Sequence, residues 1–119
     1  MVQGILHFYN AFKNSWNGLK YAFRYEWAFK FELVLLACAI PCAFVLGNNA
    51  VELILLIGSV VLLLIVELLN SAIETTVDRI SLEHHPLSGL AKDLASAAIF
   101  VVGINAAVTW GIFLVYALL

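Results

Sequence analysis

Hydrophobic residues form three long runs along the chain, and each is long enough to cross a membrane. The first run covers residues 28–47, and the second covers residues 51–73 and continues as a helix to about residue 80. The third covers residues 94–118 and contains no charged residue. About 20 apolar helical residues cross the roughly 30 Å hydrocarbon core of a bilayer. The pattern therefore predicts three transmembrane helices.

The first 25 residues follow a different pattern, in which large apolar side chains alternate with polar ones at helical spacing. Lys13, Lys20 and Arg24 occupy other faces than the apolar residues, which are Ile5, Phe8, Phe12, Trp16, Leu19 and Phe23. Such a segment is typical of a helix that lies in the membrane interface. We therefore expect residues 1–119 to form one all-α membrane domain, with a surface helix over residues 1–25 followed by three spans.

The positions of the basic residues predict how the chain is oriented. A turn at Gly47-Asn48-Asn49 separates the first two spans, and Ser81–Gly89 separates the last two. The first turn has no basic residue, whereas basic residues precede the first span and flank the second connection: Lys13, Lys20, Arg24, Lys30, Arg79 and Lys92. The positive-inside tendency places the N-terminus and the Ser81–Gly89 connection in the cytoplasm.

Composition supports a membrane protein and excludes one class of partner. Of the 119 residues, 64% are hydrophobic and 12% are charged, which is far from the composition of soluble domains. A net charge of −2 with six basic residues gives no extended patch for nucleic acid. Cys38 and Cys42 are expected to act as small apolar residues, not as disulfide partners or metal ligands.

One helical face near the end of the second span carries an unusual stripe of polar residues. At about 100° per residue its members fall within an arc of roughly 100°; they are Glu67, Asn70, Ser71, Glu74 and Asp78. An acid at the centre of a membrane helix costs about 2.5–3.5 kcal/mol. The stripe is therefore expected to face protein, trapped water or a cation, which makes it the candidate functional site.

The residue types in and near this stripe indicate particular chemistry. Glu26 and Glu74 are both expected near the cytoplasmic boundary, and paired carboxylates there suit Mg²⁺ bound together with substrate phosphates. Glu67 lies two turns deeper, where burial would make it a stronger base for taking a proton from a hydroxyl. Asn70 and Ser71 can orient neighbouring groups.

Simpler interpretations exist for several other residues. Asp78 and Arg79 could form an exposed charge pair at a helix end, and His84 and His85 could be solvated loop residues. Lys92 could be a topology anchor. The tryptophans are expected to anchor the membrane boundaries; they are Trp16, Trp27 and Trp110.

Three segments, in this order and spacing, resemble the prokaryotic diacylglycerol kinase family of small membrane lipid kinases. They are YEWAFKFE, VELLNSAIETTVDRIS and EHHPLSGLAKDLASAA, and the resemblance extends from Gly18 to the end of the third span. It implies a homotrimer in the bacterial inner membrane, with active sites shared between subunits at the cytoplasmic interface. It also implies transfer of the γ-phosphate of MgATP to the primary hydroxyl of diacylglycerol, giving phosphatidic acid.

The resemblance also implies roles for individual residues. The general base matches Glu67, and the metal-binding acids, which also contact ATP, match Glu26 and Glu74. Further ATP contacts match Glu83, His84, His85, Lys92 and Asp93. Positions near the lipid substrate match Glu32, Asn70 and Ser96, together with Glu67. The chain departs from the family pattern where His84 replaces an aromatic residue, where Leu90 replaces an arginine, and where His7 and Asn10 replace basic residues.

Three alternatives remain open on the sequence. A related branch of the family phosphorylates undecaprenol, and the choice of acceptor depends on the shape of a groove. Buried acids also occur in small transporters and proton-conducting subunits, although here they cluster near the boundary. A non-catalytic assembly protein would tolerate Glu67→Gln and Glu74→Gln.

Overall fold

The computed structural model describes residues 1–119, and these form four helices and no strand. The helices are α1 (Val2–Tyr25), α2 (Trp27–Leu46), α3 (Ala50–Ile80) and α4 (Pro86–Leu118). The last three are long and apolar enough to cross a membrane. The predicted all-α membrane architecture, with an N-terminal helix before three spans, is therefore confirmed.

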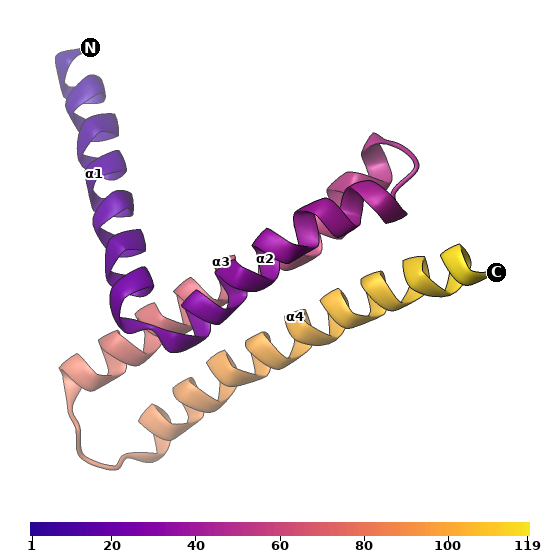
Figure 1. The fold of residues 1–119 in the computed structure, drawn as a ribbon. Coiled ribbons are helices and arrows are strands. Elements are labelled where there is room, and N and C mark those ends of the chain that lie inside the picture. Colours follow the sequence, from indigo (N-terminus) through magenta and orange to yellow (C-terminus); the bar gives the residue numbers. More distant parts are fainter.

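The N-terminal helix α1 stands away from the other three at a wide angle (Figure 1). The change of direction occurs at Glu26, whose φ of −98° and ψ of 106° are extended and interrupt the helical run. Ala22 is the one buried residue of α1. This helix is therefore attached to the bundle near its C-terminal end, and most of its aromatic side chains are exposed.

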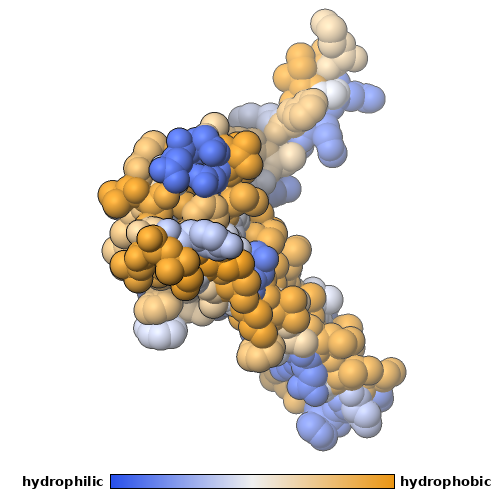
Figure 2. Space-filling view, turned by 90° about the vertical axis from the view of Figure 1, so that its right-hand side faces the viewer, coloured by the Kyte–Doolittle hydropathy of each residue, from blue (hydrophilic) through white to orange (hydrophobic).

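Helix α3 is the centre of the bundle, because it packs along both α2 and α4, while α2 and α4 barely touch (Figure 1). Its buried apolar residues are Leu56, Val60, Leu64 and Val77. The facing helices contribute small side chains such as Ala39, Ala43 and Ala95, which permit the close approach that favours packing between membrane helices. The face of the molecule shown in Figure 2 is mostly hydrophobic, as expected for a surface that contacts lipid.

Polar side chains fix the two connections of the bundle. At the turn before α3, Asn49 Oδ1 accepts a hydrogen bond from Glu52 N at 3.0 Å, and Glu52 Oε2 accepts one from Asn48 N at 2.9 Å. Before α4, His85 Nδ1 accepts a hydrogen bond from Leu87 N at 3.1 Å. These side-chain acceptors satisfy backbone N–H groups at the starts of α3 and α4, where no helical carbonyl is available to them.

The second connection is shorter than the predicted Ser81–Gly89, because α4 already begins at Pro86. Proline is favoured at the first position of a helix, where its missing N–H needs no partner and its fixed φ is helical. A second proline, Pro41, lies inside α2 and does not end that helix, which continues to Leu46.

Trp110 ties α4 to α3 inside the bundle. Its Nε1 donates to Leu56 O at 3.2 Å and to Ser59 Oγ at 3.1 Å, and Ser59 Oγ in turn donates to Leu56 O at 2.8 Å. Within the chain, Trp110 therefore forms a polar link between helices, and its role as a boundary anchor stays a prediction.

The α1–α2 junction and the loop between α3 and α4 lie at the same end of the bundle (Figure 1). The turn between α2 and α3 and the C-terminus lie at the opposite end. The two segments rich in basic residues therefore share one end, as the sequence predicts, and this end carries the candidate site.

Candidate active site

The polar stripe of α3 runs from the exposed end of the helix into the bundle. Asp78 and Glu74 are exposed, Ser71 and Asn70 are half-buried, and Glu67 is buried, with 7% of its surface exposed. These residues therefore lie on one face of α3, and their exposure to water decreases from Asp78 to Glu67. Glu67 is the acid that water reaches least.

A second buried acid comes from the neighbouring helix. Glu32 of α2 is 6% exposed and lies within Coulombic range of Glu67. Glu26, at the junction before α2, and Glu74 also lie within Coulombic range of Glu67. The structure therefore places three of the predicted site acids, from α2, α3 and the α1–α2 junction, near a fourth, Glu67.

Polar atoms in this cluster lack partners within the chain. Asn70 Nδ2 donates to Glu74 Oε1 at 3.5 Å, at the long end of the hydrogen-bond range. Asn70 Oδ1 and Glu32 Oε2 are buried and accept no hydrogen bond. Buried polar atoms are nearly always satisfied, so these two oxygens point to a hydroxyl, a water or a proton as a further component of the site.

The four acids of the cluster are not neutralised by any cation of the chain. Like charges this close repel one another, and the chain's one ion pair, between Lys92 and Asp78, leaves all four acids without a cationic partner. No set of three or more His, Cys, Asp or Glu side chains is arranged to hold a metal by itself. Mg²⁺ commonly uses one or two carboxylates and completes its coordination with phosphate oxygens and water.

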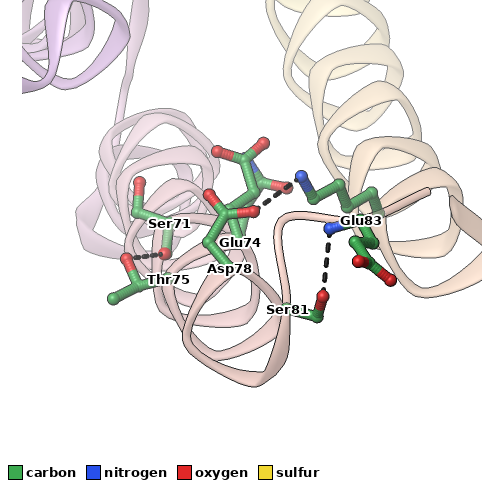
Figure 3. Close-up of polar contacts among 8 residues, drawn as sticks. Ser71, Glu74, Thr75, Asp78, Ser81 and Glu83 are labelled. Carbon is green, nitrogen blue, oxygen red and sulfur yellow. Dashed lines mark hydrogen bonds and ion pairs between the residues drawn. The ribbon is translucent and has the colours of Figure 1, made fainter. Parts of the chain in front are cut away.

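Lys92 brings a positive charge from α4 to the exposed end of the stripe. Its Nζ donates to Asp78 Oδ1 at 2.9 Å, and Glu74 lies within Coulombic range of the same lysine. Figure 3 shows Glu74 and Asp78 projecting from α3 toward α4, with the dashed line to the lysine crossing between the helices. Asp78 is therefore paired with Lys92, and the pair with its neighbour Arg79 is not formed.

Five of the seven predicted ATP contacts line one pocket of about 280 Å³ between the end of α3 and the start of α4, whereas Glu26 and Glu74 lie outside it. Its lining includes Asp78 and five predicted ATP contacts: Glu83, His84, His85, Lys92 and Asp93. Hydrogen bonds shape the loop, since Glu83 N donates to Ser81 Oγ at 3.0 Å (Figure 3). His85 caps α4 through Nδ1, which leaves Nε2 for any ligand.

Two residues of this region had no assigned role in the sequence-based site. Ser81 and Ser88 line the pocket, but isolated serines in a loop carry no recognisable spacing. A larger groove of about 820 Å³ lies between α1 and α3 and is lined by Ser15, Glu26, Ser71 and Thr75, among others. Ser15 is a further polar residue that the sequence pattern did not single out.

The predicted lipid-binding residue Ser96 and two polar residues of α1 lie on exposed surfaces. Ser96 is exposed on α4, and it is not among the residues that line the small pocket. His7 and Asn10 are exposed on α1, which leaves the first turns of that helix free of contacts with the site.

Together, the fold and the site define a small multi-pass helical membrane protein with a carboxylate cluster and a lysine at one end of its bundle. The family described as prokaryotic diacylglycerol kinase matches residues 13–114. The chain belongs to this family, and the predicted class of enzyme, a diacylglycerol kinase, is confirmed.

Individual relatives are similar in sequence to this chain over most of their length. The chain is 48% identical over 108 residues to a diacylglycerol kinase of Haemophilus influenzae, covering 91% of this chain and 92% of that protein. It is 50% identical over 100 residues to the enzyme of Escherichia coli K12, covering 84% and 82%. It is 50% identical over 107 residues to that of Pseudomonas aeruginosa, covering 90% and 87%. Membership of a kinase family implies ATP as co-substrate and, in most kinases, a divalent metal.

Proposed function

We propose that this enzyme transfers the γ-phosphate of MgATP to the primary hydroxyl of diacylglycerol, with Glu67 as the general base. The observation that carries the proposal is the burial of Glu67 beside Glu26, Glu32 and Glu74. A buried carboxylate at the membrane end of an acidic stripe can meet a lipid hydroxyl without extracting the acyl chains from the bilayer.

In the proposed reaction, Glu67 accepts the proton of the lipid hydroxyl as the oxygen forms a bond to the γ-phosphorus. The bond from this phosphorus to the oxygen that bridges it to the β-phosphate breaks, and ADP leaves. Glu67 then returns the proton to water. Phosphoryl transfer depends mainly on positioning and charge stabilisation, so a base and an anchored nucleotide suffice.

Glu26 and Glu74 are the proposed ligands of Mg²⁺, which neutralises phosphate charge when bound. Lys92 is proposed to exchange Asp78 for a nucleotide phosphate. Both members of that pair are about half exposed, and water screens exposed pairs so that they contribute little to stability, which allows the exchange. The other nucleotide contacts are proposed for the pocket residues Glu83, His84, His85 and Asp93.

Asn70 is proposed to hold the lipid hydroxyl beside Glu67. Support comes from its Oδ1, which is buried without a partner one turn from Glu67. Glu32 carries a similarly unpartnered oxygen and would line the same end of the lipid. Ser96 would approach the lipid from α4, on the exposed side of that helix.

We further propose a homotrimer in the bacterial inner membrane, with the N-terminus in the cytoplasm. Only 6% of the residues in an apolar 18-residue stretch of α4 are buried within one chain, which leaves a large surface for a neighbouring subunit or lipid. The orientation rests on the basic residues, which flank the α1–α2 junction and the α3–α4 loop at one end of the bundle.

The acceptor can be identified directly with purified protein in detergent micelles. γ-Labelled ATP is supplied with diacylglycerol and with undecaprenol in parallel, and we expect label in phosphatidic acid. Preferential labelling of undecaprenyl phosphate would replace diacylglycerol with the alternative acceptor. Absence of labelled lipid with either acceptor would overturn the proposed reaction.

Orientation requires a separate test. In a background with Cys38→Ala and Cys42→Ala, single cysteines are placed at Leu82 and at Asn48, which lie in the two connections of the bundle. A membrane-impermeant maleimide added to intact cells should label Asn48→Cys and spare Leu82→Cys. The reverse pattern would place the candidate site outside the cytoplasm.

A further inference from the structure

Residues 82–84 of the loop between α3 and α4 take part in a single hydrogen bond. No bond between backbone groups involves them. Their one hydrogen bond is donated by Glu83 N to Ser81 Oγ at 3.0 Å (Figure 3). The Ser81 hydroxyl is therefore the only group of the chain that holds the inner part of this exposed loop by a hydrogen bond.

The same serine also ends α3. Ser81 N donates to Val77 O at 3.2 Å, and the φ of −168° and ψ of 144° at Ser81 are extended. A serine hydroxyl that accepts an amide two residues later forms a local turn. One residue therefore stops the helix and fixes the direction in which the loop leaves it.

The residue held by this serine carries a carboxylate. Glu83 lines the pocket of about 280 Å³ together with Ser81 and Lys92, and its carboxylate forms no ion pair. A carboxylate accepts hydrogen bonds from hydroxyl and amino groups, and it repels phosphate. In a pocket where Lys92 is proposed to receive a phosphate, the position of the Glu83 carboxylate therefore affects how well a nucleotide binds.

We propose that Ser81 is a positioning residue for nucleotide binding, which acts by holding the backbone of Glu83 through its hydroxyl. This role rests on the proposed nucleotide site. An exposed loop that is not held must be ordered when a ligand binds, and the ordering lowers the affinity. Loss of one hydrogen bond of this kind changes an equilibrium by about twofold to tenfold. The change should appear in the KM for ATP and not in kcat, because the proposed base Glu67 lies about 20 Å away along α3.

A matched pair of variants isolates the hydroxyl. Threonine and valine have nearly the same shape, and both favour the extended backbone that Ser81 adopts. Initial rates are measured over a range of ATP concentrations at saturating diacylglycerol. Ser81→Thr keeps the acceptor and should keep the KM for ATP, whereas Ser81→Val should raise it about twofold to tenfold with kcat unchanged. Equal KM values in the two variants would overturn the proposal.

A double-mutant cycle tests whether Ser81 acts through Glu83. Glu83→Ala removes the carboxylate that the hydrogen bond positions, and it should raise the KM for ATP by itself. In this background, Ser81→Val should add less than about twofold, below the usual effect of a lost hydrogen bond. An undiminished effect would indicate direct contact between the Ser81 hydroxyl and the nucleotide, and it would overturn the positioning role.

A control variant removes a hydroxyl elsewhere on the same connection's second helix. Thr109→Val removes a hydroxyl that donates to Asn105 O within α4, about 24 Å along the helix from Asp93, and it should leave the KM for ATP unchanged. If Ser81→Val does not fold, as judged by circular dichroism, Ser81→Ala takes its place with the same expected KM.

Failure of the Ser81 role can be distinguished from failure of the nucleotide site. If Lys92→Met and Glu83→Ala both leave the KM for ATP unchanged, the nucleotide binds elsewhere, and both the site and the role of Ser81 are overturned. If these two variants raise the KM and Ser81→Val does not, only the role of Ser81 is overturned.

Discussion

Lys92 Nζ donates a hydrogen bond to Asp78 Oδ1 at 2.9 Å, which joins the start of α4 to the end of α3. The two side chains are 44% and 47% exposed, so water screens the pair and little stability depends on it. The lysine is thus held at the mouth of the pocket and remains available for a phosphate.

Neutralising the lysine should affect nucleotide use more than stability. Lys92→Met should raise the KM for ATP about tenfold to a hundredfold, because a hydrogen bond to a charged group contributes about 1.5–3 kcal/mol. Asp78→Asn frees the lysine and should leave this KM unchanged or lower it. Initial rates over a range of ATP concentrations make the comparison. Equal defects in both variants would indicate that the pair is structural.

Removing the proposed base should stop chemistry without preventing nucleotide binding. Glu67→Gln should lower kcat about 10²- to 10⁴-fold, the usual contribution of general base catalysis, while the Kd for MgATP stays within a few-fold. Glu52→Gln is the matched control, because this glutamate caps the turn at the opposite end of the bundle. A kcat close to that of the unchanged protein would remove Glu67 from the role of base.

The proposed metal ligands can be tested by magnesium titration. Glu26→Gln or Glu74→Gln should raise the Mg²⁺ concentration for half-maximal activity at least about tenfold, since even outer-sphere partners of metal ligands change affinity by that factor. Asn70→Ala removes the 3.5 Å contact to Glu74 and should cause a smaller shift. Titration midpoints that do not move in either glutamine variant would contradict the assignment.

The link between α3 and α4 should matter for stability alone. Trp110→Phe removes the hydrogen bonds to Leu56 O and Ser59 Oγ, and the expected loss is about 0.6 kcal/mol, with an upper value of about 1.7 kcal/mol, as for similar contacts in membrane bundles. Ser59→Ala in the Trp110→Phe background should add little. Reversible unfolding in mixed micelles measures the change, with the exposed Trp16→Phe as control. If Trp110→Phe lowered kcat and left the free energy of unfolding unchanged, a purely structural role would be contradicted.

The membrane spans could be predicted from the sequence because hydrocarbon imposes simple rules. Every backbone amide in a bilayer must be satisfied within the protein, and the bilayer thickness sets the length of a helix. The first predicted run, 28–47, consequently matches α2 to within one residue at each end. The other two, 51–73 and 94–118, lie inside α3 and α4. The third span was expected from residue 94, where the apolar run begins, and the helix that contains it starts earlier, at Pro86 after the N-cap His85.

By itself, the sequence determined which residues are helical, which face of α3 is acidic, and which family the chain resembles, because these depend on local spacing and residue order. The tertiary structure decided which side chains come near one another: Glu32 lies in Coulombic range of Glu67, Lys92 binds Asp78, and Trp110 binds Ser59. The proximity of such side chains depends on the axial shift and rotation of one packed helix against the next. Those quantities result from the summed contacts of whole helix faces, and no short pattern along the chain encodes them.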